Sequence, residues 1–168
     1  MVMPQTPYSS DLDEREPLGA MNETLQRLRT LAKWPPAQFE ESYAPGKWTA
    51  RQILMHLAQS EMVLGSRARL ALATPNYVAQ PFDQNKLMAQ EPSLGGRDAL
   101  DALLAFAVMN RAFFSSLTPA DRAAGFSHPE YGALTVDWIV HMMAGHQIHH
   151  LKQLDTIASH AGKAIPGR

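Results

Sequence analysis

The sequence predicts an all-α fold, a four-helix bundle, on the basis of three observations. Apolar residues recur every third or fourth position in four separate stretches, and none of these stretches has the strict alternation of a half-buried strand. Segments rich in proline and glycine separate the stretches. The chain has 168 residues, of which 45% are hydrophobic, which is enough for one domain with its own core. Four amphipathic helices can bury their apolar stripes against one another, as a bundle does.

The first helix is expected to begin near residue 18. Its apolar residues recur at threes and fours: Leu18, Met21, Leu25, Leu28 and Leu31. Residues 1–15 have no such pattern and are expected to form a flexible N-terminal tail, so the single bundle domain is expected at 16–160. The stretch WPPAQFEESYAPGKW, with its prolines and glycine, ends the first helix.

The second helix is expected from about Thr49 to Ala73. Thr49 suits the N-cap position, and Gln52 stands three residues later, where its side chain completes a capping box. The inward face of this helix carries Ile53, Leu57, Ser60 and Leu64. The connection that follows, residues 74–96, is expected to hold no more than a short helical turn, and connections of this length in compact domains are often functional.

The third and fourth helices are expected at about 97–117 and 136–159. The third carries one apolar face, made of Leu100, Leu103, Leu104, Ala107 and Phe114. Between these helices, TPADR predicts a single capped turn with proline at a first helical position, and GFSHPEYGAL predicts a loop or a small irregular hairpin. Thr135 is expected to cap the fourth helix, and residues 161–168 are expected to form a C-terminal tail.

Composition and charge exclude several classes of protein. Fifteen basic residues face 16 acidic ones, so the chain lacks the positive balance that favours nucleic acid or an anionic membrane surface. No apolar run approaches the roughly 18 residues of a transmembrane helix, and the first residues do not resemble a signal peptide. We therefore expect a cytoplasmic protein. The absence of cysteine excludes disulfides, thiolate metal ligands and a cysteine nucleophile.

Histidines cluster near the end of the chain, in the stretch AGHQIHHLKQLDTI. The fourth helix has an inward stripe with a period of three and four, consisting of Ile139, Met143, His146, His150, Leu154 and Ile157. Residues four apart lie about 40° apart around the helix axis and about 6 Å apart along it, so two imidazoles so placed can reach one ion. Geometry also permits His149 to pair with His146, but the stripe favours His146 and His150.

His56 lies on the inward face of the second helix, beside Ile53 and Leu57. Bundles commonly build metal sites from side chains on facing helices, so His56, His146 and His150 are predicted to bind one divalent transition metal. Three neutral ligands leave coordination positions open, as in catalytic sites. Zinc and nickel are the first expectations, with iron and manganese as alternatives. The competing interpretation is three hydrogen-bonded core histidines, but burying them without partners would cost about 1–3 kcal/mol each.

Two segments resemble the signatures of the DinB/YfiT-like family of metal-dependent four-helix bundles, and most closely its YfiT-like branch. PGKWTARQILMHLAQSE is similar to the family segment that contributes a histidine ligand, which here is His56. HPEYGALTVDWIVHMMAGHQIHHLKQL is similar to the second signature, whose two ligands fall on His146 and His150. QPFDQNKL resembles the middle segment, with Asp83 at its centre. The resemblance covers residues 18–157.

The resemblance implies an up-down-down-up bundle with a long crossover connection, and a homodimer. Family members with an assigned activity are largely transferases or isomerases that use bacillithiol, mycothiol or glutathione. It therefore implies a metal-dependent thiol S-transferase, whose partners are a small-molecule thiol and an electrophilic substrate. Two alternatives stay open: a metal-binding stress-response protein without enzymatic activity, and a metal-dependent hydrolase whose open site activates water. No catalytic residue beyond the metal ligands is assigned.

Several other polar residues are expected to have structural roles. His149 is expected at the helix surface or at an interface, with a role next to the metal ligands or the substrate as the alternative. His141 is expected at the surface, Glu61 in solvent or in an intersubunit pair, and Gln153 as a polar residue at the edge of the site.

Three residues in the loops carry weaker expectations. His128 and Tyr131 either line the mouth of the site or belong to a plain loop. Asp83 either orients a ligand histidine or caps a turn.

Overall fold

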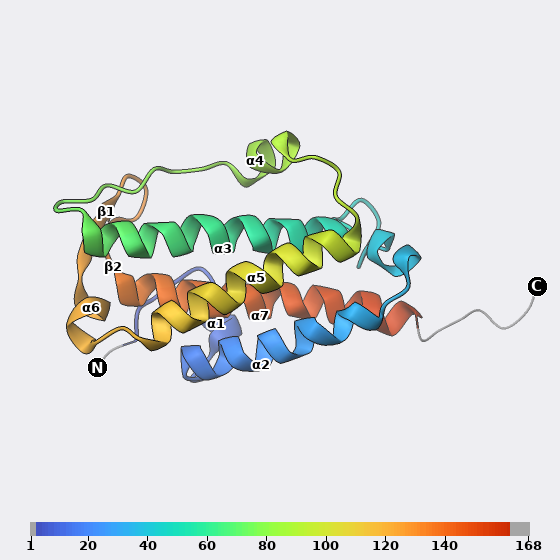
Figure 1. The fold of residues 1–168 in the computed structure, drawn as a ribbon, viewed down its shortest axis with the longest axis horizontal. Helices are drawn as coiled ribbons and strands as arrows, with labels where there is room; N and C mark the ends of the chain where they lie inside the picture. Colours follow the sequence, from blue (N-terminus) through green and yellow to red (C-terminus); the bar gives the residue numbers. More distant parts are fainter. Residues whose placement is uncertain (1–2, 162–168) are drawn as a thin grey trace, which may run out of the picture.

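The computed structural model describes residues 3–161, so residues 162–168 of the expected C-terminal tail lie outside the described residues. Four long helices form the bundle: α2 (Pro17–Thr30), α3 (Ala50–Ala73), α5 (Gly96–Ser115) and α7 (Val136–Ala161). Helices α2 and α7 run in one direction and α3 and α5 in the other, which gives an up-down-down-up bundle (Figure 1). The predicted all-α four-helix bundle is therefore confirmed.

The helix starts follow from local side-chain chemistry. At Thr49 the hydroxyl accepts from the Gln52 N–H, and the Gln52 side chain accepts from the Thr49 N–H, so the predicted capping box is present. The hydroxyl of Thr135 accepts a hydrogen bond from the Trp138 N–H at 3.2 Å, which fixes the first turn of α7. At the start of α2, Pro17 occupies a first helical position behind the Glu16 carboxylate, which accepts two backbone N–H bonds.

The connection between α3 and α5 has to return along the whole bundle, because these two helices are neighbours that run in the same direction. It crosses the outside of α3 and contains the short helix α4 (Gln84–Gln90) (Figure 1). The Asp83 carboxylate accepts from the N–H groups of Asn85 and Lys86, so Asp83 caps α4. Of the two roles expected for Asp83, the structure supports the turn cap.

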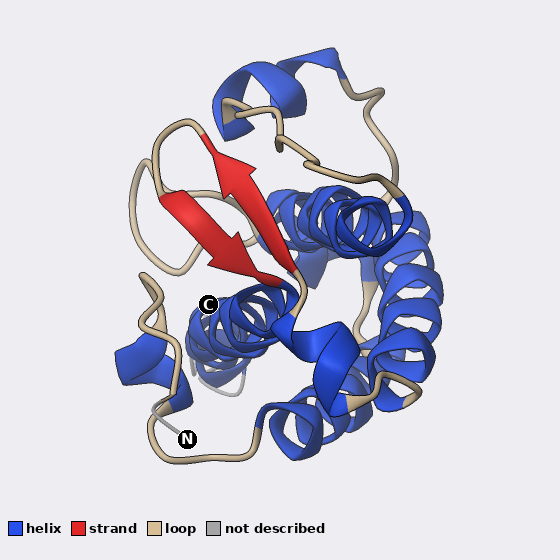
Figure 2. Cartoon of the chain, turned by 90° about the vertical axis from the view of Figure 1, so that its left-hand side faces the viewer, coloured by secondary structure: helices blue, strands red, loops and turns tan. Residues whose placement is uncertain are grey.

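A small hairpin closes one end of the bundle. Strand β1 (Gly125–His128) pairs antiparallel with β2 (Gly132–Thr135), and the short helix α6 (Pro119–Ala123) precedes it. The hairpin stands beside the ends of the long helices (Figure 2). The first strand also holds the crossover connection, because Ser127 donates to the Tyr77 carbonyl and accepts from the Ala79 N–H. Hairpin and crossover thus form one layer over α3 and α7.

The N-terminal segment differs from the expected flexible tail. It contains the helical turn α1 (Ser9–Leu12), which packs against α7. Leu12 is buried in the core, and the Trp138 indole N–H donates to the Gln5 carbonyl at 2.9 Å. The reason is that α7 is apolar on this side as well, so the segment covers it.

Two 3₁₀ turns, η1 (Leu31–Lys33) and η2 (Pro36–Glu40), connect α2 to α3. No helix within residues 3–161 combines the length and the apolar character needed to cross a membrane.

The core of the bundle holds a buried polar network as well as apolar side chains. Glu61 on α3 is 3% exposed, and its carboxylate accepts hydrogen bonds from the side-chain amides of Asn110 on α5 and Gln147 on α7. Gly65 makes room for Asn110, because a Cβ at residue 65 would collide with the Asn110 amide. The expectation that Glu61 is solvated or lies in an intersubunit pair is wrong. Glu61 is five residues after His56, so its side chain points away from the histidines and into the place where α3, α5 and α7 meet.

Candidate metal centre

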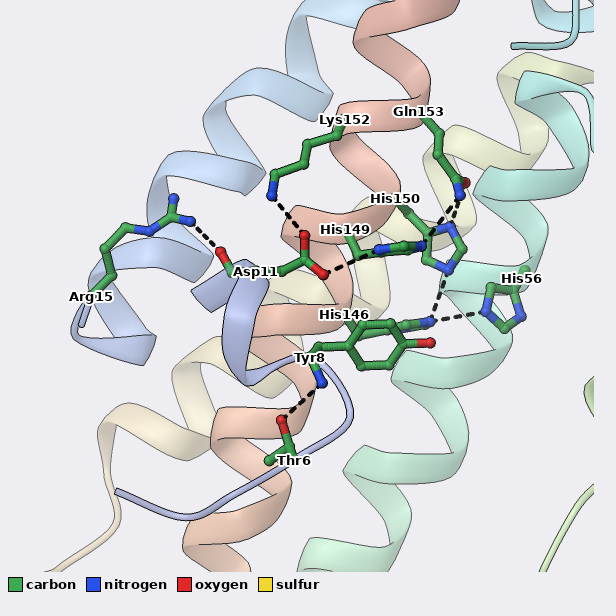
Figure 3. A network of polar contacts seen from close by, with 10 residues as sticks. All are labelled: Thr6, Tyr8, Asp11, Arg15, His56, His146, His149, His150, Lys152 and Gln153. Carbon is green, nitrogen blue, oxygen red and sulfur yellow. Dashed lines mark hydrogen bonds and ion pairs between the residues drawn. The ribbon is translucent and has the colours of Figure 1, made fainter. Parts of the chain in front are cut away.

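The three histidines expected to bind metal lie together in the bundle core. His56 comes from the second turn of α3, and His146 and His150 stand one turn apart on α7, which runs antiparallel to α3. The Nε2 atom of His146 is 3.0 Å from Nε2 of His56 and 3.0 Å from Nε2 of His150 (Figure 3). All three side chains are buried. Three imidazole nitrogens therefore meet between two helices, as a metal site would require.

The hydrogen-bond partners of His150 fix its ring. Nδ1 lies 2.8 Å from Oε1 of Gln153, and because an amide oxygen only accepts, Nδ1 carries the hydrogen. Nε2 of His150 is then an unprotonated nitrogen that faces the other two histidines. The contact holds the ring in the orientation needed for a metal ligand, as second ring nitrogens do in metal sites. Gln153 stands at position i+3 from His150, and it has this specific role in addition to lying at the edge of the site.

The environment keeps the imidazoles neutral. Burial, followed by the nearby charge of His150, lowers the pKa of His56 to about 3. Burial also lowers the pKa of His150 to about 4, although its hydrogen bond to Gln153 acts in the opposite direction. For His146, burial and then the neighbouring histidines hold the pKa well below 6.5. Neutral imidazoles are the form that binds metal.

A divalent metal fits this arrangement. Imidazole nitrogens bind zinc at about 2.0–2.1 Å, which places ligands at angles between 90° and tetrahedral about 2.9–3.4 Å apart. The two Nε2 separations of 3.0 Å fall in this range. Because Nε2 of His150 carries no hydrogen, at most one of the two contacts at His146 is a well-formed hydrogen bond. A shared cation would remove the repulsion between the remaining lone pairs.

An N-terminal tyrosine, which the sequence analysis did not select, forms one wall of this site. The ring of Tyr8 packs against His146, with ring centroids 4.9 Å apart, and its hydroxyl points to the side where the histidines meet (Figure 3). Burial raises the pKa of the Tyr8 phenol. The described residues provide no hydrogen-bond partner for this hydroxyl.

Residues of α7 seat the tyrosine. At Gly145 a Cβ would lie 2.5 Å from the Tyr8 carbonyl oxygen, so only glycine allows this approach of the two backbones. One turn further, His149 and Lys152 contact the Asp11 carboxylate at 3.1 and 2.7 Å (Figure 3). His149 is thus half-buried and holds the N-terminal segment, and its ring also lies edge-on to that of His150, with ring centroids 5.0 Å apart.

A cavity of about 220 Å³ opens from the histidines along the seam between α3 and α7. Its floor comes from the two helices, and its roof from the crossover connection, the hairpin and the N-terminal segment. The walls are mainly apolar, with Leu64, Phe126, Leu134, Trp138, Ile139 and Met142. His56 and His146 stand at one end, and His128 and Tyr131 also line the cavity. Of the two alternatives for His128 and Tyr131, the structure therefore supports the mouth of the site.

The expectation for His141 is wrong. Its side chain is 7% exposed, because the N-terminal segment covers it, and its Nδ1 lies 2.9 Å from the Asp137 carbonyl oxygen. It points away from the histidine cluster and borders a small cavity beneath Gln5 and Ser9. Trp48 lies against the site, with its ring centroid 4.9 Å from that of His56.

The sequence pattern of the DinB superfamily matches residues 20–154. The chain belongs to the DinB superfamily. This confirms the resemblance seen in the two histidine-containing segments.

Relatives in this superfamily are similar over most of the chain. A protein of Oceanobacillus iheyensis named "Putative metal-dependent hydrolase" is 30% identical over 138 residues, 80% of either chain. YfiT of Bacillus subtilis, which bears the same kind of name, is 25% identical over 129 residues, 75% of this chain and 72% of its own.

Solved structures show the same fold. The structure of Bacillus subtilis YfiT superposes with a TM-score of 0.75 at 21% identity and covers 96% of this chain and 93% of YfiT. A mycothiol-dependent maleylpyruvate isomerase superposes with a TM-score of 0.67 at 17% identity, over 89% of this chain and 63% of the isomerase. At these identities the comparison shows a shared fold.

Proposed function

We propose that this protein is a metal-dependent enzyme that transfers a low-molecular-weight thiol to an electrophilic substrate. His56, His146 and His150 would hold one divalent transition metal, with zinc or nickel ahead of iron or manganese. The observation that carries the proposal is the meeting of three neutral Nε2 atoms at the end of a cavity. A structural metal site has no need of such a cavity, whereas a catalytic site does.

When bound, the metal supplies a Lewis acid that lowers the pKa of a thiol or of water. Gln153 keeps His150 in the tautomer that presents Nε2. The Tyr8 hydroxyl, which lies beside His146, donates a hydrogen bond to the sulfur of the bound thiol. The apolar walls of the cavity exclude water from the reacting atoms, which protects the nucleophile from hydrogen-bonding to solvent.

The transfer balances without a further reactant. The thiol loses its proton to solvent, its sulfur forms a bond to the electrophilic carbon, and the leaving group departs with the electron pair of the broken bond. The sulfur has to come from outside, because the chain contains no cysteine. The fold shared with the mycothiol-dependent isomerase supports the choice of a small thiol.

Hydrolysis is the second candidate, and the names of the relatives favour it. The same three histidines and open cavity would then bring water to the metal. The two functions differ in what the cavity has to admit. For thiol transfer it admits a thiol that reaches the metal, whereas for hydrolysis it admits only the substrate that is hydrolysed.

Cobalt-substituted protein distinguishes these functions. We expect its visible spectrum to change when a thiol is added, and chlorodinitrobenzene to be conjugated faster than by the thiol alone. His56→Ala should abolish both effects, whereas His160→Ala, which alters an exposed histidine at the end of the same helix as His146, should preserve them. If no physiological thiol alters the spectrum, the transferase proposal fails, and ester or amide hydrolysis becomes the activity to measure.

A further inference from the structure

A buried arginine stands at the far end of the same cavity. Arg67 lies on α3, and His56, Ser60, Leu64 and Arg67 line the cavity in succession. Its side chain is buried, at 8% exposed for the residue. The guanidinium donates one hydrogen bond, from Nη2 to the Gln80 carbonyl of the crossover, and its Cζ lies 5.3 Å from the centre of the Phe82 ring.

The charge of Arg67 has no carboxylate partner. Within residues 3–161, no Asp or Glu oxygen lies within 4.0 Å of its guanidinium nitrogens. The acidic residue that lines the cavity, Glu130, is exposed to solvent. A guanidinium has five N–H donors, and among the described residues only one of those of Arg67 has a protein partner. Because an unpaired buried charge is costly, an anion brought into this cavity would be favourable.

His128 adds a second donor on the opposite side of the cavity. Its Nδ1 accepts from the Glu130 N–H at 3.2 Å, so the neutral ring carries its hydrogen on Nε2. Among the described residues, nothing accepts a hydrogen bond from this Nε2. Burial and then the charge of Arg67 lower the pKa of His128, whereas Glu130 acts in the opposite direction, and both Arg67 and His128 line the cavity. A carboxylate between Arg67 and His128 would receive hydrogen bonds from both.

The distance between the two ends of the cavity limits the size of the ligand. His56 and Arg67 are 11 residues apart on one straight helix, which corresponds to a rise of about 16 Å. Both side chains lean toward the N-terminus of the helix, and because the arginine side chain is longer than that of histidine, their polar ends are closer together than this rise. A ligand of small-metabolite size can therefore reach the histidines with one end and Arg67 with the other.

We propose that Arg67 and His128 form a carboxylate-binding subsite, so that the enzyme selects a small acidic molecule. Resting on the proposed function, this inference requires that one of the two reactants carry a carboxylate, as the thiols glutathione and bacillithiol do. The carboxylate belongs either to the thiol or to the electrophile, and the same subsite serves in both cases. The bond to Gln80 also attaches the crossover to α3, so the test has to separate binding from stability.

The test compares acids with their esters. We expect cobalt-substituted protein to bind glutathione roughly tenfold more tightly than glutathione diethyl ester, because only the acid can accept from the guanidinium. Conjugation of 4-chloro-3,5-dinitrobenzoate and of its methyl ester tests the electrophile in the same way. In Arg67→Met the preference for the acid should disappear. Arg69→Met is the matched control, since Arg69 also packs on a phenylalanine ring, 4.2 Å from that of Phe113, but does not line the cavity.

A measurement on the metal-free wild type covers the case in which Arg67→Met does not fold. The ¹⁵N resonance of the Arg67 side chain should shift when S-methylglutathione is added, and should not shift with its diester. A preference for the acid that survives in folded Arg67→Met overturns the proposal, as does the absence of any preference in the wild type. If Arg67→Met loses the preference for the acid over the ester, the proposal is supported. Whether the preference is lost for the two thiols or for the two electrophiles identifies which reactant carries the carboxylate.

The two proposals fail in different ways. If thiols leave the cobalt spectrum unchanged but S-methylglutathione still shifts the Arg67 resonance, the transferase proposal fails and the carboxylate subsite stands. If thiols alter the spectrum but the acid and the ester behave equally in both the thiol pair and the electrophile pair, the metal centre stands and the subsite fails.

Discussion

The metal-free protein should lose stability steeply as the pH falls below 6.5, because its three clustered histidines resist protonation. In the unfolded chain a histidine titrates near pH 6.5, whereas in the folded protein the pKa of His56 is about 3 and that of His150 about 4. Between these pH values the unfolded state binds protons that the folded state does not. The free energy of unfolding is therefore retained above pH 6.5 and is lost as the pH falls toward 4.

The size of the effect follows from linkage. At pH 5 each histidine that stays neutral in the folded state costs about 2 kcal/mol, which is 1.36 kcal/mol times the 1.5 units between 6.5 and 5. His146, whose pKa lies well below 6.5, contributes in the same direction. His56 and His150 together should remove roughly 4 kcal/mol, with a further loss from His146, which is a large part of the 5–15 kcal/mol that stabilises a typical domain.

Urea unfolding at pH 7, 6 and 5 in the presence of chelator, followed by circular dichroism at 222 nm, measures this loss. In His56→Gln the difference in unfolding free energy between pH 7 and pH 5 should be smaller by about 2 kcal/mol. His160→Gln, in which an exposed histidine is replaced, should show the wild-type difference. Equal pH dependence in His56→Gln and the wild type would refute the reasoning.

Four further predictions concern the metal, the tyrosine and association. Purified protein should contain close to one transition metal per chain, and His150→Ala should contain much less; equal content by elemental analysis would remove His150 from the site. At pH 7.5, free metal at 100 times its Kd should stabilise the protein by about 2.7 kcal/mol, so chelator should lower the melting temperature, and superimposable melts would contradict a metal shared by two helices. Tyr8→Phe should lower thiol conjugation about tenfold with unchanged metal content, while Tyr131→Phe, at the mouth of the cavity, should be nearly neutral; equal rates for the two variants would count against the Tyr8 hydroxyl. The family resemblance predicts a homodimer, and sedimentation at micromolar concentration that shows only monomer would rule it out.

The parts of the site that lie on regular helices could be predicted from the sequence. The period of the apolar residues placed His56, His146 and His150 on inward faces, and antiparallel packing of α3 and α7 brings those faces together. The capping box at Thr49 fixed the start of α3 from two residues. Gln153 could have been found by the same reasoning, since its spacing of three from His150 allows contact on a helix.

The rest depends on contacts between distant segments. Tyr8 lies in a stretch without periodicity, and it is seated by Gly145, whose missing side chain matters only once the two backbones are known to approach. His141 is buried because that same segment covers it. Glu61 is a charged residue on a long helix, which usually means exposure, and its partners Asn110 and Gln147 come from two other helices. Single-helix patterns contain no information about such junctions.

The roof of the cavity comes from three segments that are remote in sequence: residues near 8, near 82 and near 130. The histidines stand instead on two long helices that the bundle core holds in place. Substitutions or insertions in the roof would change which molecules enter while leaving the distances among the three Nε2 atoms as they are. We therefore expect a change of substrate in evolution or in engineering to fall mainly on this roof and on Arg67 at the far end of the cavity, while the same three histidines serve many different reactants.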